Sequence, residues 1–318
     1  MKNTFRYMLI LVPFLLALGC KKDDNSTTLP SLSGSTVNDP IPFVRVGASQ
    51  SFKVDISDIY STDNTNPGTL GLCWQVNGGD RDTTSRDLSK LNPSYVVTTD
   101  KTGNYSVIAT VFAVNGQYYS DAVSFAFQAI DPETALSETR EGTETVIDGN
   151  PYLIMETGGK TWMGMNLYGT ESGQDYRGCE VVSALFGRYY SWEEAQTVCP
   201  EGWHLPTGAE FDQTLGSQAG DLMVNIQFLS VDMWTYWPQV PITNRLKFNA
   251  MPTGYMDMTT TQEVFGYKEY ACWWTADESP EDNLGVFRYI QQEEPLVMAG
   301  KGSKESLRMN VRCVRNAD

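Results

Sequence analysis

The sequence CPEGWHLPT fills residues 199–207, and the sequence SLRMNVRCVR fills residues 306–315 near the end of the chain. The first stretch lies where one short helix should end and another begin, and the second alternates as a strand does. Each stretch carries one cysteine, Cys199 and Cys313. If these two cysteines pair, one bond joins a helix end to the last strand and ties the C-terminal region together.

Residues 1–19 have the features of a signal peptide rather than of a folded element. Lys2 and Arg6 precede an apolar run that is too short to predict a bilayer-spanning helix. The run ends in LALGC, which resembles a bacterial lipobox except that Leu18 is larger than the usual residue. We expect Cys20 to be acylated and to anchor the protein by lipid alone, with ordinary secretion as the alternative.

Residues 20–36 predict a flexible tether, because they are rich in serine and threonine and offer little apolar surface to bury. The charged run KKDDN at residues 21–25 resembles the surface-export signal of Bacteroidetes lipoproteins, although it also suits a plain solvated tether. We therefore expect a protein that is lipid-anchored in the outer membrane and exposed at the cell surface.

The charge of the chain argues against one broad class of partner. The sequence has 23 basic and 39 acidic residues, which give a formal net charge of −16. Such a surface repels nucleic acids and anionic lipids, and no basic cluster offsets it. We predict no nucleic-acid partner, and contact with the membrane only through the lipid anchor.

Cysteine and histidine usage limits the chemistry that the chain can perform. Besides Cys20 the sequence contains Cys73, Cys179, Cys199, Cys272 and Cys313, and its one histidine is His204. A Cys199–Cys313 bond is preferred and a Cys179–Cys272 bond is the second candidate, but spacing alone does not settle the connectivity. One histidine excludes sites that need two, and no Gly-x-Ser-x-Gly motif marks a nucleophile. We therefore interpret His204 as structural rather than as a general base, and predict no enzyme, no catalytic residues, no metal ligands and no cofactor.

Residues 37–131 show short alternating runs separated by turn residues, a pattern typical of an all-β antiparallel sandwich. Trp74, followed by an Asn-Gly turn and by GNYSV at residues 103–107, resembles a PKD-type immunoglobulin-like domain. In such a domain Trp74 fills the core and Tyr105 forms a tyrosine corner, so we expect a spacer or interaction module. The polar residues 132–144 are predicted to link this domain to the next.

Residues 145–318 combine strand-like runs with two helix starts. Residues 191–194 and 207–210 each have the Ser/Thr-x-x-Glu pattern of a capping box, and the first helix should run to about Val198. Further strand-like segments are residues 246–254, 271–276, 285–290 and 307–314. The pattern predicts an α+β domain with two short helices.

In chain order, pieces of this domain resemble the Fibrobacter succinogenes major paralogous domain. The matching segments are TWMGMNL at 161–167, GRYYSWEEA at 187–195, CPEGWHLPT at 199–207, FNAMPTG at 248–254, WWT at 273–275 and VRCVR at 311–315. This family looks similar to the C-type-lectin-like fold, which implies a twisted antiparallel sheet and a disulfide from the first helix region to the last strand. The resemblance also implies exported, often lipid-anchored proteins of largely unassigned function, and no catalytic residue set.

Calcium-dependent sugar-binding lectins of this fold carry Glu-Pro-Asn or Gln-Pro-Asp motifs and a Trp-Asn-Asp motif, which this sequence lacks. The acidic stretch from Asp277 to Asn283 has oxygen ligands of the kind that calcium binds. A solvated acidic loop is the preferred interpretation, so no metal site is predicted there.

Aromatic residues on loops are the strongest candidates for ligand contact, and they are Trp234, Tyr236, Trp237, Tyr255 and Trp274. The first three lie on a long loop after the second helix, where exposed rings would favour stacking on a sugar or a protein contact. Tyr255 would extend the same patch or serve as a core or rim residue. Trp274 is included because, of two consecutive tryptophans in a regular strand, one faces outward.

We expect a binding or adhesion protein that recognises a glycan or a protein ligand through loops of the C-terminal domain. The alternative is a structural component of the envelope or of fimbriae without a small ligand, and an enzyme is the least favoured class. The two main hypotheses differ at the loop: the first needs exposed rings, and the second predicts that Trp234 and Trp237 are buried.

Overall fold

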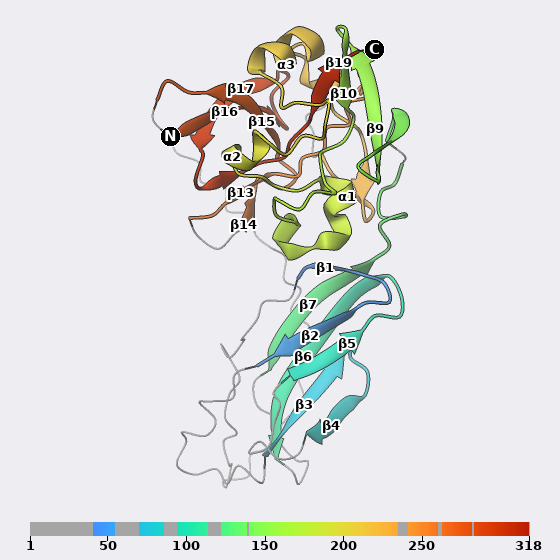
Figure 1. The fold of residues 1–318 in the computed structure, drawn as a ribbon. Coiled ribbons are helices and arrows are strands. Elements are labelled where there is room, and N and C mark those ends of the chain that lie inside the picture. Colours follow the sequence, from blue (N-terminus) through green and yellow to red (C-terminus); the bar gives the residue numbers. More distant parts are fainter. Residues whose placement is uncertain are drawn as a thin grey trace, which may run out of the picture.

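The computed structural model describes residues 41–54, 70–85, 94–113, 122–138, 140–234, 241–259, 263–281 and 283–317. Figure 1 shows two bodies, a β-sheet body made of the described residues between 43 and 130 and a larger body made of the described residues that follow. The predicted signal peptide and lipidated tether lie outside the described residues. Within the described ranges, no helix combines the length and the apolar character needed to cross a membrane.

The described part of the smaller body, the lower one in Figure 1, is built from strands alone. They are β1 (Phe43–Arg45), β2 (Ser49–Lys53), β3 (Leu70–Val76), β4 (Arg81–Ser85), β5 (Ser94–Thr98), β6 (Gly103–Ala113) and β7 (Val123–Ile130). One sheet has the order β1-β7-β6-β3-β4, in which β1 is parallel to β7 and the other neighbours are antiparallel. Strands β2 and β5 form a separate antiparallel pair.

Side chains from both sheets of the lower body meet in one apolar core. Trp74 of β3 is buried as predicted and stacks on Tyr95 of β5, with ring centroids 5.2 Å apart. Phe52 of β2 lies 5.2 Å from Phe125 of β7. The Tyr105 hydroxyl donates to the backbone carbonyl four residues upstream (3.1 Å), the contact that a tyrosine corner makes. The alternating pattern of the sequence therefore corresponds to real inward-facing positions.

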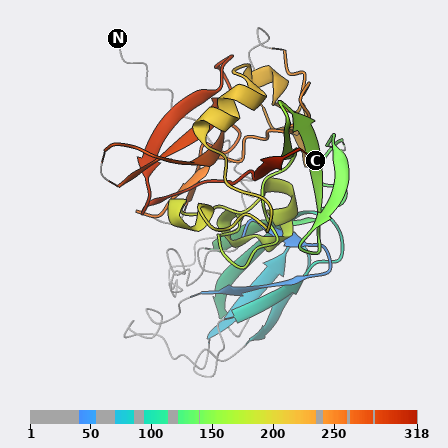
Figure 2. The same cartoon turned by 45° about the horizontal axis from the view of Figure 1, so that its top comes forward.

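The larger, upper body contains shorter strands arranged in several small antiparallel sheets. They are β8 (Thr143–Ile147), β9 (Asn150–Thr157), β10 (Lys160–Met163), β11 (Gln227–Phe228), β12 (Val231–Asp232), β13 (Tyr255–Asp257), β14 (Glu263–Phe265), β15 (Tyr270–Glu278), β16 (Leu284–Gln291), β17 (Met298–Ser303), β18 (Leu307–Arg308) and β19 (Val314–Asn316). The sheet orders are β19-β10-β9-β8, β14-β13-β18, β15-β16-β17 and β11-β12. Figures 1 and 2 both show the β15-β16-β17 sheet and the β8-β9 hairpin on opposite sides of this body.

Short helices connect these sheets. They are α1 (Ser183–Phe186), α2 (Trp192–Ala195), α3 (Gly208–Leu215) and the 3₁₀ turns η4 (Tyr176–Gly178), η5 (Glu180–Val182) and η6 (Ala219–Asp221). Both predicted capping boxes are present, at the starts of α2 and α3. Helix α2 ends at Ala195, earlier than predicted, and its last turn is closed by the Thr197 hydroxyl, which donates to the Glu194 carbonyl (3.4 Å). Helix α1 carried no cap signal in the sequence.

Two of the predicted strand segments are wrong in their extent. Residues 246–254 form no strand, and residues 307–314 are a strand only at Leu307–Arg308 and from Val314 onward. The chain between these ends is irregular because its buried polar side chains, Asn310 and Arg312, bond to other irregular segments. Residues 271–276 and 285–290 lie within β15 and β16, as predicted.

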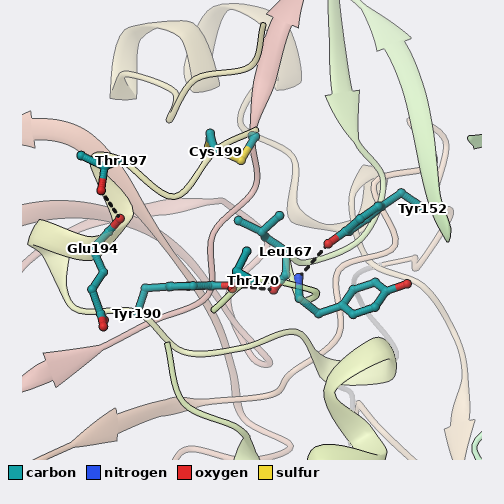
Figure 3. The surroundings of a disulfide bond; sticks show 9 residues. Tyr152, Leu167, Thr170, Tyr190, Glu194, Thr197 and Cys199 are labelled. Atoms are coloured by element: carbon teal, nitrogen blue, oxygen red, sulfur yellow. Dashed lines mark hydrogen bonds between the residues drawn. A yellow bond between two sulfur atoms is a disulfide. The ribbon is translucent and has the colours of Figure 1, made fainter. Parts of the chain in front are cut away.

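The Cys199–Cys313 bond is present and joins residues 114 positions apart, with a Cα–Cα distance of 5.8 Å. Cys179 and Cys272 are free and buried, so the second candidate disulfide is wrong. These two cysteines belong to different apolar clusters, Cys179 beside Tyr176 and Cys272 within β15. Figure 3 shows the disulfide above Tyr190, whose hydroxyl lies 2.8 Å from that of Thr170.

Arg312 is the central polar residue of the upper body. Its fully buried guanidinium donates to the Asn166 side chain (2.6 Å) and to the backbone carbonyls of Met163 (3.2 Å), Phe248 and Asn249 (3.3 Å). It also lies 4.2 Å from the centroid of the Phe248 ring. Burial lowers the pKa of Arg312, because the charged form loses its water. Carbonyl dipoles and an aromatic face therefore stabilise this cation, and in return it holds irregular backbone segments in place.

The predicted linker, residues 132–144, is packed against the upper body. The Arg140 guanidinium donates to two consecutive backbone carbonyls of α1 (3.1 and 3.2 Å). The Asn249 side chain accepts from the Glu141 backbone N–H (3.1 Å) and donates to the Glu141 carbonyl (2.7 Å). Phe43 of β1 also packs against the upper body, 5.3 Å from Phe228. The two bodies are thus joined by bonded backbone and a shared apolar cluster.

Candidate functional site

The two candidate tryptophans that the structure describes, Trp234 and Trp274, are not exposed. Trp234 is buried and its indole N–H donates to the Ala250 carbonyl (3.2 Å). Tyr236 and Trp237 lie outside the described residues. The described part of the loop therefore plugs into the core, which was the alternative interpretation.

The expectation that one of the two consecutive tryptophans of β15 faces outward is wrong. Trp273 lies in one apolar cluster with Phe248, and Trp274 lies in another, where its indole N–H donates to the Tyr190 carbonyl (2.9 Å). Both rings are buried. Because side chains cover both faces of β15, the alternation of the strand leaves neither ring in solvent.

Tyr255, the remaining candidate, is half-buried and belongs to a row of rings that crosses two sheets. The row, called here the aromatic row, consists of Phe265, Tyr255, Tyr270, Tyr289 and Phe287. Successive ring centroids in this order are 6.1, 6.4, 6.1 and 5.6 Å apart. The sequence contained these residues, but only their cross-strand positions bring them together.

Two glycines support rings of the aromatic row. A Cβ atom at Gly300 would lie 2.3 Å from Phe287 Cζ, and one at Gly266 would lie 2.4 Å from Tyr270 Cδ2. Each ring therefore lies directly against glycine backbone, which only a residue without a side chain permits. The glycine backbone therefore limits the positions that these two rings can take.

The aromatic row is partly open and its surroundings are acidic. Phe265 is 37% exposed, whereas the other four rings are half-buried. Burial raises the pKa of Tyr255, and the charges of Asp257 and Glu269 raise it further. Burial and the Glu269 charge likewise raise the pKa of Tyr270. Tyr255 and Tyr270 therefore stay protonated at neutral pH and can donate hydrogen bonds, while the nearby carboxylates disfavour anionic ligands.

His204 is part of a surface ion-pair group that supports α3. Its Nε2 lies 3.0 Å from Glu210 Oε1, which also accepts from Lys160 Nζ (2.9 Å). Glu210 closes the capping box with Thr207. Burial opposes ionisation of Glu210, but the bonds from Thr207, Lys160 and His204 outweigh it and lower its pKa to about 2. These contacts account for His204 as a structural residue.

The acidic stretch that covers the end of β15 and the residues after it uses its described carboxylates in contacts within the protein. Asp277 accepts from the backbone N–H of Gly208 at the start of α3 (2.7 Å). Glu278 pairs with Lys304 (3.0 Å), and Glu281 pairs with Lys301 (2.8 Å). Across the described ranges, no three His, Cys, Asp or Glu side chains form a group that could hold a metal ion.

An open groove of about 950 Å³ lies between residues 132–146 and the upper body. Its lining is largely apolar, but it includes two arginines, Arg45 of β1 and Arg140. The sequence did not predict this groove, because the polar residues 132–144 were interpreted as a linker rather than as a segment that packs beside a strand. The one signal in the sequence was that this segment carries both acidic and basic residues.

The family model described as the Fibrobacter succinogenes major domain matches residues 155–315. The match spans every strand from β10 to β18 and all the described helices, and it includes all five residues of the aromatic row. No curated protein matches the chain.

Proposed function

We propose that this chain, which belongs to the Fibrobacter succinogenes major domain family, is a surface binding protein that contacts a glycan or protein ligand through the aromatic row. The observation that carries the proposal is a row of partly open rings, two of which rest on glycine backbone. Aromatic faces with tyrosine hydroxyl groups suit both sugar rings and protein hot spots. Rings whose positions are already limited lose less conformational freedom on binding.

The acidic surroundings narrow the ligand within this proposal. Asp257, Glu263 and Glu269 lie on or beside the strands that carry the row, and the whole chain has a net charge of −16. A neutral glycan or a neutral to basic protein surface therefore fits better than an anionic polymer. The ligand contact then differs from the one predicted at Trp234 and Trp274, whose rings are buried.

The wider architecture of the proposal is a lipid anchor, a spacer and a binding head. Acylation of Cys20 and a tether at residues 20–36 would place the protein on the outer membrane, facing outward. The sandwich arrangement and the Tyr105 contact support a PKD-type immunoglobulin-like spacer. The Cys199–Cys313 bond and the two capped helices support a C-type-lectin-like head.

The test measures binding to a glycan array and to immobilised surface proteins. It compares the full mature chain with a variant that lacks two rings of the aromatic row. The Tyr255→Ala plus Tyr289→Ala variant should bind the ligand about tenfold or more weakly, because the loss of each ring removes contact area from the centre of the aromatic row. The control is Tyr95→Ala, which removes a half-buried tyrosine from the other body. The assignment of ligand binding to the aromatic row would be contradicted if the two variants lost affinity to the same extent, or if neither variant lost affinity.

A structural role in the envelope or in fimbriae is the second candidate, and the burial of Trp234, Trp273 and Trp274 supports it. In that case the aromatic row would be covered by a neighbouring surface molecule rather than by a ligand. Chemical crosslinking on intact cells separates the two proposals. A structural component gives the same stoichiometric crosslinks in every growth condition, whereas a binding protein gives crosslinks that depend on added ligand.

A further inference from the structure

The groove beside residues 132–146 has β8 as one wall, and β8 is an edge strand of the β19-β10-β9-β8 sheet. Glu144, Thr145 and Val146 of β8 all line the groove, and Val146 is 70% exposed. An edge strand presents unpaired backbone groups to which an extended chain can add. The groove therefore offers a backbone surface as well as an apolar one.

The register of β8 on β9 shows which backbone groups are open. The Leu153 carbonyl accepts from the Gly164 N–H (2.7 Å), on the side away from β8, and Pro151 has no N–H to donate. The residues that face them on β8, Glu144 and Val146, form the non-bonded pairs of the ladder. Their own N–H and C=O groups consequently point outward, and within the described ranges no backbone group of another strand or loop bonds to them.

Arg140, which comes shortly before β8, brings a cation to the same groove. Its guanidinium is half-buried and donates to two neutral backbone carbonyls. Burial lowers the pKa of Arg140 to about 10, so the side chain remains charged at neutral pH. Among the described residues no carboxylate lies within ion-pair distance of Arg140, nor of Arg45 on the opposite wall. These two carbonyls take one proton from each terminal nitrogen, so three N–H donors of the guanidinium remain, and a carboxylate is suited to accept charge-assisted bonds from them.

We propose that this groove binds the carboxyl-terminal segment of an extended polypeptide, which adds antiparallel to β8 and gives its terminal carboxylate to Arg140. The direction of the bound peptide follows from the position of Arg140 at the start of β8. An antiparallel strand ends beside the start of β8, next to Arg140, whereas a parallel strand would bring its positive amino terminus there. Glu144 and Val146 supply the backbone bonds, and Arg140 reads the free end of the chain.

The lining predicts which peptide side chains the groove accepts. The floor is apolar and consists of Tyr152, Leu153, Met165, Tyr168, Ala184 and Leu185. The rim carries the exposed carboxylates of Glu133, Glu138, Glu144 and Glu180. Alternate apolar residues should therefore enter the groove, while neutral or basic residues face the rim and acidic ones are disfavoured. A small organic acid could meet Arg140, but only a polypeptide also matches the spacing of the open backbone groups on β8.

The experiment uses the full mature chain and a hexapeptide array in which each sequence appears once with a free carboxyl terminus and once as the amide. The tightest binders are then measured by fluorescence anisotropy. The free-acid form should bind about tenfold or more tighter than the amide, because a charge-assisted bond is lost in the amide. Arg140→Gln should remove this difference while leaving the weaker, amide-like affinity.

Variants of Val146 test the strand addition separately. Val146→Pro removes an outward N–H without breaking a bond to β9, so it should weaken the acid and amide forms alike. Val146→Thr keeps the backbone donor and should leave binding within about twofold of the parent. If Arg140→Gln fails to fold, the acid–amide comparison on the parent chain and the Val146 pair still decide the question.

Three outcomes would overturn the proposal. One is an array in which no sequence shows a preference for the free carboxyl end. Another is peptide binding that Val146→Pro leaves unchanged. The third is that decanoate competes as well as an unlabelled peptide does and that Val146→Pro does not change this competition, because this result would identify a site for small organic acids. None of these outcomes bears on the aromatic row, which lies on different strands.

Discussion

The two bodies of the molecule are stabilised by different kinds of contact. The lower body has long ladders, such as the seven paired positions of β3 and β6, and an apolar core around Trp74. Among its described residues, the buried polar side chains are Gln50 and Thr99. The upper body has short strands, and its buried polar side chains include Asn166, Asn249, Thr253, Asn310 and Arg312. In the first body the described backbone bonds mainly to itself, with Thr99 bonding to one turn, whereas in the second several polar side chains bond to irregular backbone.

This difference explains where a contact surface can form. Regular ladders leave few open backbone groups except at sheet edges, so the described part of the lower body has few such groups away from its edges. Polar side chains allow the upper body to connect several small sheets at different angles, which creates sheet junctions and open edges. The aromatic row crosses one such junction, and the groove lies beside one such edge.

The largest expected effect is that of Arg312→Met. This variant leaves the carbonyls of Met163, Phe248 and Asn249 without this donor, and it leaves the Asn166 side-chain oxygen with the Trp273 indole N–H as its remaining donor. Each buried acceptor that is left unpaired costs about 1–3 kcal/mol, so the unfolding free energy should fall by at least about 3 kcal/mol. Hydrogen–deuterium exchange should therefore show lost protection throughout the upper body while β3, β6 and β7 remain protected.

The matched control is Arg245→Met, which removes an exposed guanidinium paired with Asp221. Because surface ion pairs contribute little, its unfolding free energy should change by less than about 1 kcal/mol. If Arg312→Met were no more destabilising than this control, the contrast between the two bodies would be incorrect. Loss of protection in β3 and β6 to the same extent would instead indicate that the bodies unfold as one unit.

The second effect, somewhat smaller, is expected from removal of the disulfide. The Cys199→Ser plus Cys313→Ser variant releases a constraint between residues 114 positions apart, which is worth about 2–4 kcal/mol. The midpoint of urea unfolding should fall for the upper body alone, because the smaller body contains no disulfide among its described residues. Treatment of the parent chain with dithiothreitol should reproduce the change, and equal shifts in both bodies would count against independent stabilisation.

The same contrast accounts for what could be predicted of the fold. Alternation identified the buried position of Trp74 in the lower body, and residues 271–276 were correctly predicted to be a strand, although the alternation did not predict that Trp273 and Trp274 are both buried. The prediction of a strand fails at residues 246–254, which form an irregular segment that Arg312 bonds at Phe248 and Asn249. A periodic pattern reports which side chains are buried but not whether the backbone bonds to another strand. Capping boxes depend on local bonds alone, and both were predicted correctly.

The candidate site was harder to predict than the fold, because exposure depends on what covers each strand. Trp274 was expected to face outward, but β15 is covered on both faces, so its ring contacts Tyr190 and Phe287 instead. Tyr255 was named for its position next to the preceding segment, whereas its partners come from β14 and β15. Such partners are determined by the register of strands that are distant in sequence.

The smallest effect concerns acid stability and tests whether polar side chains also stabilise the helical part of the upper body. The folded state lowers the pKa of Glu210 from 4.5 to about 2, through bonds from Thr207, Lys160 and His204 that outweigh the opposing effect of burial. Unfolding therefore takes up a proton below about pH 4.5, and the stabilisation from Glu210 is lost as the pH falls toward 2. After allowance for solvent screening it is worth about 1–2 kcal/mol above pH 4.5.

Glu210→Gln should thus lower the unfolding free energy at pH 7, and the gap to the parent should close between pH 4.5 and 2 in urea titrations. The control is Glu201→Gln, which removes an exposed carboxylate. The difference in unfolding free energy between this variant and the parent should stay constant from pH 7 to pH 2. A gap for Glu210→Gln that stays constant down to pH 2 would mean that the amide fails for steric reasons rather than for lack of charge. In that case the start of α3 would depend on packing, as the lower body does, and the contrast would be confined to the network around Arg312.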